Sequence, residues 1–233
     1  MLPEDFRDGV RTALPSLLGL IPFGLVAGIA AVNAGLSPLQ AVGLSAIVFA
    51  GASQLAAIDL LAQDASLVVV VLTAVVINLR MAMYSASIAP HFQSLRRRWE
   101  MVCSYLLTDV SYALAITEFS EDESTRADGD AGTSHRWYYL GVAGAIWAGW
   151  QVTTVAGVLL GTGIPDEWNV GFAVPLVFLT LLVSEVSDRP RLVAALVGGG
   201  VAVVGSTWPL NLGLIGGGLA GVVAGVLADG RVG

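Results

Sequence analysis

The chain has 233 residues, of which 55% are hydrophobic and only 12% are charged. A soluble domain carries about twice that share of charge, so the composition excludes one and predicts an all-α protein that crosses a membrane several times. All 11 basic residues are arginine, which excludes a phosphate-binding P-loop lysine and a Schiff-base lysine. The net charge of −7 without lysine indicates a salt-adapted prokaryote.

The first half of the chain predicts one long helix followed by a broken one. The apolar run 12–34 contains Pro15 and Pro22, so we expect it to be kinked or partly unwound. Ser37 and Pro38 then form a helix start. The next apolar run, 39–62, is interrupted by the small and polar residues Gly51, Ala52, Ser53 and Gln54, which predict two half-helices in place of one span.

The run 67–89 is long enough to cross a bilayer, which needs about 20 residues. It nevertheless contains Asn78 and Arg80. A charged side chain near the bilayer centre costs roughly 2.5–3.5 kcal/mol on insertion scales, so Arg80 is expected to face the protein interior. The arginines at 96–98 follow, and the positive-inside rule places their loop in the cytoplasm.

A helix over 101–118 is expected to carry Tyr105, Asp109 and Tyr112 on one face, with Thr108 bordering it. Asp109 could pair with Arg80 or take up a proton, because burial raises the pKa of a carboxyl and a nearby arginine lowers it. The sequence leaves both readings open. Residues 119–136 form an acidic extramembrane loop, expected to be disordered.

Helices are then expected over 137–161, starting at the aromatic anchor Trp137–Tyr139, and over 165–184, 192–206 and 210–227. Together these runs predict about six to eight membrane-embedded helices, including re-entrant half-helices, in one transporter domain over 1–233. A short echo between residues 26–38 and 155–165 suggests repeat halves at 12–118 and 137–228. In an inverted-topology repeat, a common transporter plan, the helix after Trp137 would run opposite to the first.

Four-residue spacing of glycines in the last helix predicts a flat face for close helix packing, within the chain or against a second protein. These are Gly213, Gly217, Gly221 and Gly225. The single cysteine, Cys103, and the widely separated His91 and His135 predict no metal, cofactor or redox centre. The absence of a nucleophile–base pair argues against an enzyme.

Two sets of residues could bind a solute. A break at Gly51–Gln54 exposes backbone N–H groups and a positive dipole end, which suit a carboxylate; tight helix crossing is the structural alternative. The second set is Asn78 and Arg80 with Asp109, for which a structural ion pair is the alternative. Backbone N–H groups would hold the solute, while Arg80 pairs with Asp109; direct binding by Arg80 is the other possibility.

Three segments together resemble the AzlC-type family of branched-chain amino-acid exporters. They read FAGASQLAA at 49–57, VINLRMAMYSASIAP at 76–90 and LLTDVSYAL at 106–114, with support from IPFGLVAG at 21–28 and WYYLG at 137–141. The resemblance implies the large permease subunit of a plasma-membrane exporter of valine, leucine and isoleucine, driven by protons and working with a small AzlD-type membrane subunit.

Carried over by position, the family's marked residues fall here on Gly51, Ser53, Gln54, Asn78, Arg80, Thr108 and Asp109. Met81 and Val110 stand where the family often has histidine and glutamate, which leaves Asp109 as the better proton carrier. The alternatives are the membrane subunit of an ATP-driven transporter, an exporter of another small amphipathic solute, and a passive channel or scaffold. We expect membrane lipid as a partner and no nucleic acid.

Overall fold

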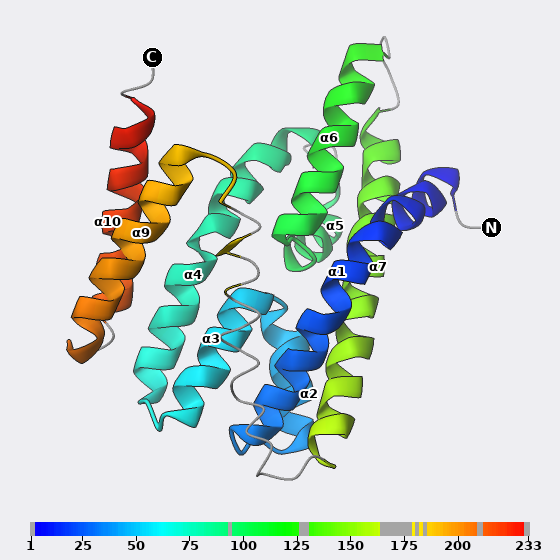
Figure 1. Ribbon diagram of the computed structural model, residues 1–233. Helices are drawn as coiled ribbons and strands as arrows, with labels where there is room; N and C mark the ends of the chain where they lie inside the picture. Colours follow the sequence, from blue (N-terminus) through cyan, green and yellow to red (C-terminus); the bar gives the residue numbers. More distant parts are fainter. Residues whose placement is uncertain are drawn as a thin grey trace.

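The computed structural model describes residues 3–92, 95–125, 131–163, 179, 182–183, 186–208 and 212–230. Every element among them is helical: α1 (Glu4–Asn33), α2 (Pro38–Val48), α3 (Gly51–Ala62), α4 (Leu67–Ile88), η1 (Ala89–Phe92), α5 (Arg97–Tyr105), α6 (Asp109–Thr125), α7 (Ala131–Gly161), α9 (Arg189–Val204), η4 (Gly205–Thr207) and α10 (Leu212–Asp229). Within these ranges, five helices are long and apolar enough to cross a membrane. Figure 1 shows them as a layered helical assembly, so the predicted all-α membrane protein is confirmed.

The first helix is longer and more regular than the sequence predicted. It begins at Glu4, not near residue 12, and continues through Pro15 and Pro22 to Asn33. Acidic residues in its first turn are favourable beside the positive end of the helix dipole. Of the two alternatives, kinked or partly unwound, the second is wrong, since the helix is continuous; Figure 1 shows that it bends. The predicted start of the next helix at Ser37 and Pro38 is confirmed by a capping box.

The helices α1 and α7 pack along their whole length and run parallel. A Cβ added at Gly28 would collide with the Thr154 carbonyl oxygen and lie 2.6 Å from the Val158 nitrogen. Toward the other end, Gly9 faces Tyr138 in the same way. Residue numbers increase in the same direction along both helices, and both run downward in Figure 1. The prediction that the helix after Trp137 runs opposite to the first is therefore wrong.

A different pair of units runs in opposite directions. Each has two half-helices followed by a long helix: α2 and α3 before α4, and α5 and α6 before α7. In Figure 1 the first pair enters from the lower end and the second from the upper end. The halves at 12–118 and 137–228 stay a prediction, since most of residues 164–185 lie outside the described ranges.

The half-helices α5 and α6 correct a second expectation. The single helix predicted over 101–118 is interrupted after Tyr105 and restarts at Asp109, so Tyr105 and Asp109 do not share one helical face. The acidic segment 119–136 is also helical where it is described: α6 continues to Thr125 and α7 begins at Ala131. Its central residues, 126–130, lie outside the described part of the chain.

The C-terminal glycines pack inside this chain. A Cβ at Gly217 would lie 2.6 Å from the Gly198 carbonyl oxygen, and one at Gly221 would lie 2.8 Å from the Ala194 carbonyl oxygen. Gly213 faces Gly205, and Gly225 faces the Ala194 side chain. The predicted close-packing face is thus used to join α10 to α9. The predicted aromatic anchor at the start of α7 is partly core, because Tyr139 is fully buried.

Candidate functional site at two helix breaks

The first break separates α2 from α3 in the middle of the molecule. Phe49 takes a left-handed backbone conformation with φ 36°, and Ala50 is extended. No side chain caps the start of α3, whose first backbone N–H groups have no partner within the helix. The sequence-predicted break is therefore confirmed: two half-helices are joined by Phe49 and Ala50.

The second break lies between α5 and α6 and is capped internally. The Ser111 N–H donates to the Thr108 side-chain oxygen at 3.2 Å, and the Thr108 N–H donates to the Ser111 hydroxyl at 2.8 Å. These reciprocal bonds are a capping box with serine in the third position. Thr108 is therefore a helix cap. The signal was present in the sequence, since threonine followed by aspartate is a typical helix start.

The tips of the two half-helix pairs contact one another through Tyr105. Its hydroxyl donates to the Ala46 carbonyl oxygen near the end of α2, and its ring lies 6.1 Å from that of Phe49. Trp147 of α7 donates to the Tyr105 hydroxyl at 2.9 Å. One turn later, Trp150 donates to the Ser45 hydroxyl at 2.9 Å. Both breaks thus lie at the same depth, near the middle of α7.

Buried polar atoms without partners gather around the first break. Gln54 is fully buried, and neither its side-chain nitrogen nor its oxygen has a hydrogen-bond partner within the described residues. Ser53 is equally buried, but its hydroxyl donates to the Ala50 carbonyl oxygen at 3.0 Å. An unsatisfied buried amide costs about 1–3 kcal/mol. Gln54 is therefore the clearest polar group that a ligand could satisfy.

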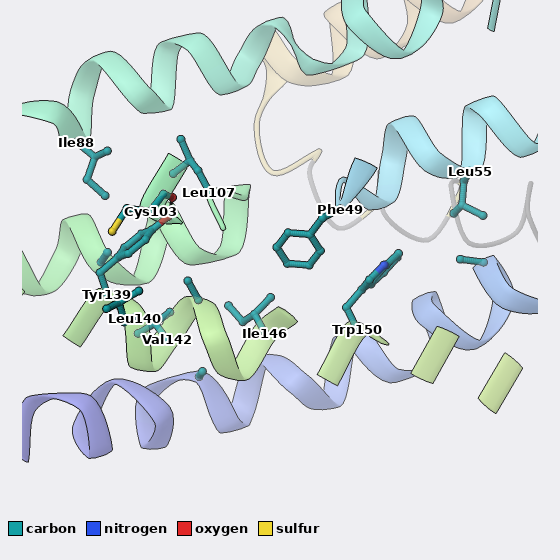
Figure 2. Packing of buried hydrophobic residues seen from close by; sticks show 14 of the residues in the cluster. Phe49, Leu55, Ile88, Cys103, Leu107, Tyr139, Leu140, Val142, Ile146 and Trp150 are labelled. Atoms are coloured by element: carbon teal, nitrogen blue, oxygen red, sulfur yellow. Dashed lines mark hydrogen bonds between the residues drawn. The ribbon is translucent and has the colours of Figure 1, made fainter. Parts of the chain in front are cut away.

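Gly51 packs closely against two aromatic rings, which is the structural alternative that the sequence left open. A Cβ there would lie 2.5 Å from the Phe23 ring and 2.9 Å from the Trp150 ring. Both rings lie in the space that a side chain at position 51 would need. Figure 2 shows the Trp150 ring near that of Phe49. The glycine therefore allows close aromatic packing of the break against α1 and α7. Ala52, the neighbouring candidate, is half-buried.

The second break carries the predicted charge pair. Arg80 on α4 lies 3.6 Å from Asp109, with side chains 35% and 51% exposed. The Arg80 Nε is buried and has no partner in the described part of the chain, and neither has the Asn78 side-chain oxygen. Three residues after Asp109, Tyr112 shares a 2.8 Å hydrogen bond with Ser87 and stacks on Tyr84. Asp109 and Tyr112 therefore both contact α4.

The structure thus brings the two predicted sets to one depth without joining them directly. Tyr105 connects them: it contacts the end of α2 and lies four residues before Asp109. Ser45, Trp147 and Trp150 complete this centre and were not predicted as site residues. A tryptophan in an apolar run is ordinarily a packing residue, so its N–H bond to another helix had no sequence signal.

The two histidines, which are far apart in sequence, are neighbours in the fold. Their ring centroids lie 5.6 Å apart, and the His135 ring stacks on Phe119. Their separation in the sequence therefore says nothing about their distance in the fold, and the absence of a metal site stays a prediction. Within the described ranges, no group of three or more metal-ligating side chains forms.

Comparison with known proteins identifies the family. The AzlC protein family model matches residues 15–164, which is more than half of the chain. The inner membrane protein YgaZ of Escherichia coli is 29% identical over 95% of this chain and 88% of its own length. A membrane protein of Archaeoglobus fulgidus is 30% identical over 93% and 92%, and one of Helicobacter pylori is 26% identical over 78% and 76%. No solved structure matches the chain. Both helix breaks and the charge pair fall inside the matched segment, and the chain belongs to the AzlC family of membrane proteins.

Proposed function

We propose that this protein is the large permease subunit of a secondary transporter that exports valine, leucine and isoleucine across the plasma membrane. The observation that carries this is the uncapped start of α3 beside the fully buried Gln54, whose side chain has no hydrogen-bond partner among the described residues. Backbone N–H groups at a helix start and a free side-chain amide together can hold a carboxylate. Buried polar groups at mid-membrane, in a broken helix, are typical of transporter binding sites.

The surroundings of the break favour a small apolar solute. Phe49 and Leu55 are buried next to it, and the Phe23 and Trp150 rings close its α1 and α7 side. Apolar surroundings with few polar groups favour ligands that carry one polar end and an apolar body. Branched-chain amino acids have this character. Their substrate carboxylate would take the place of the missing cap of α3.

Coupling to protons would act through the charge pair. Asp109 is the first residue of α6, and Arg80 holds it against α4. Protonation of Asp109 would remove its charge and leave Arg80 without its partner. That change would favour movement of the α5–α6 tip relative to α4. Because Tyr105 joins this tip to the end of α2, such movement would reach the proposed carboxylate site.

A small AzlD-type membrane protein would complete the transporter. Reconstituted vesicles that contain both chains should take up labelled leucine against a gradient when a proton gradient is imposed. Uptake should collapse with an uncoupler and should not need ATP. Cells without other exporters should also release less valine when both chains are deleted. Unchanged release would contradict the substrate assignment, and uptake that survives the uncoupler would favour a passive channel.

Gln54→Leu tests the carboxylate site itself. It keeps the side-chain volume and removes the only polar group of that residue. We expect leucine binding to fall at least tenfold, because a charge-assisted hydrogen bond contributes about 1.5–3 kcal/mol. Binding of leucinamide, which lacks the carboxylate, is weak in both proteins if the site reads a carboxylate. Equal leucine affinity in the two proteins would contradict this site.

A further inference from the structure

A cavity of about 320 Å³ borders the second break, on the side away from α3. It is enclosed by the end of α4, η1, α5 and the start of α7. Ligand sites for small molecules occupy about 300–1,000 Å³, so its volume is that of a site for a very small ligand. Figure 2 shows Ile88, Cys103, Leu107 and Tyr139 from its walls grouped together, with Ile146 between this group and the side chains of Phe49 and Trp150.

The cavity lies on the side of the Arg80–Asp109 pair that faces the arginines at 96–98. Ser85 and Ile88 line it, and they follow Arg80 by one to two turns of α4. Leu107, from the tip between α5 and α6, forms another wall. Arg96 and the first turn of α5, with Arg97 and Arg98, are at this end, which the positive-inside rule assigns to the cytoplasm. The cavity therefore lies between the cytoplasmic end and the breaks.

The lining separates into a polar and an apolar part. Glu100, Ser85 and Ser104 supply the polar atoms, whereas Ile88, Phe92 and Leu107 are buried apolar side chains. The Tyr139 hydroxyl donates to the Cys103 carbonyl oxygen at 2.9 Å, which fixes the wall between α5 and α7. Such a lining suits a solute with one polar head and a short apolar body.

Glu100 gives the polar part its charge. Its carboxylate forms no ion pair and no hydrogen bond with any residue that the structure describes, although three arginines precede it closely in sequence. An available carboxylate at the mouth of a small, mostly apolar cavity attracts a cation, and above all a primary ammonium, which donates three hydrogen bonds.

We propose that this cavity is a cytoplasmic-side recognition site for the ammonium group of the solute, with Glu100 as the binding residue. This proposal rests on the proposed function, which identifies the solute as an apolar amino acid. The two ends of the amino acid are then read at different places. Glu100 binds the ammonium first, and the start of α3 binds the carboxylate deeper in the protein.

Isobutylamine is the direct probe, because it keeps the ammonium and the branched chain of valine and lacks the carboxylate. Calorimetric titration of the purified protein should detect its binding, and Glu100→Gln should weaken that binding about 3- to 10-fold, as expected for a partly exposed charge-assisted contact. Glu4→Gln is the matched control, since Glu4 also lies in the first turn of a helix but away from the cavity. It should leave isobutylamine binding unchanged.

Two further variants keep the result clear if Glu100→Gln folds poorly. Ser104→Leu fills the cavity and retains Glu100, and it should also weaken isobutylamine binding. Glu100→Asp keeps the charge and should retain most of the affinity. Isobutyrate, which has a branched apolar group and a carboxylate but no ammonium, should bind the wild-type protein and Glu100→Gln equally. Absent amine binding in the wild-type protein, or equal binding in Glu100→Gln, overturns the assignment.

The two proposals fail in different ways. Without valine transport in vesicles, the proposed function fails, yet amine binding that depends on Glu100 still supports the cavity. With normal valine transport and the same KM in Glu100→Gln, the cavity assignment fails alone. A lipid headgroup could also supply a primary ammonium. Displacement of isobutylamine by phosphatidylethanolamine and not by valine would therefore overturn the assignment to a transported solute.

Discussion

Replacement of both members of the Arg80–Asp109 pair gives the sharpest test of the central geometry. The closest nitrogen–oxygen distance, 3.6 Å, is longer than the roughly 2.7–2.9 Å of a charge-assisted hydrogen bond. Coulomb attraction at this distance is about 4–5 kcal/mol at an effective dielectric constant of about 20. The two side chains are 35% and 51% exposed, so the net coupling must be well below that value.

Exposed ion pairs contribute about 0–1 kcal/mol to the free energy of unfolding, and removal of one member of a buried pair lowers it by about 3–5 kcal/mol. The exposure of this pair places its coupling between these limits, at about 1–3 kcal/mol. The fully buried value, which a sequence-based estimate would use, is too large. Arg80→Met and Asp109→Asn should each destabilise the protein, and the double variant should lose less than the sum.

The assay is a double-mutant cycle on the free energy of unfolding in detergent micelles. It cancels the separate contribution of Asp109 to the start of α6, where an acidic residue stabilises the helix by about 0.3–1 kcal/mol. Transport should be lost in the double variant even where stability returns. A coupling energy indistinguishable from zero would refute the ion-pair interpretation, and normal proton-driven transport in Asp109→Asn would refute its role in coupling.

Three further changes test the packing and the site. Gln54→Leu should raise the free energy of unfolding or leave it unchanged, because it removes a buried unpartnered amide, so a marked destabilisation would indicate a missing partner. Gly28→Ala should lower the free energy of unfolding by about 1–3 kcal/mol, because the new Cβ meets the α7 backbone. Gly19→Ala, with nothing within 4 Å of the new Cβ, should not lower it, and denaturant titration compares the two variants. Gly217→Ala should weaken the α9–α10 contact, and its neighbour Gly218→Ala should not, as limited proteolysis between the two helices would report.

The sequence alone was sufficient for the fold class and for the first helix break. Hydropathy and the low share of charge are local, additive properties, so they identify membrane helices without any tertiary information. The cluster from Gly51 to Gln54 is likewise a local signal of interruption. The cost of a buried arginine implied a charged partner for Arg80, and Asp109 was the natural candidate.

Only the tertiary structure decided how these pieces meet. Thr108 starts a new helix by a local signal, but the contact of the second break with the first, through the Tyr105 hydroxyl and the Ala46 carbonyl oxygen, is tertiary. Residues near Gly28 and Gly157, which carry the echo, pack side by side on two parallel helices. Hydropathy is the same for a helix that runs up or down. Contacts between distant residues therefore determined the orientation of α7, the common depth of both breaks, and the use of Gly51 for aromatic packing.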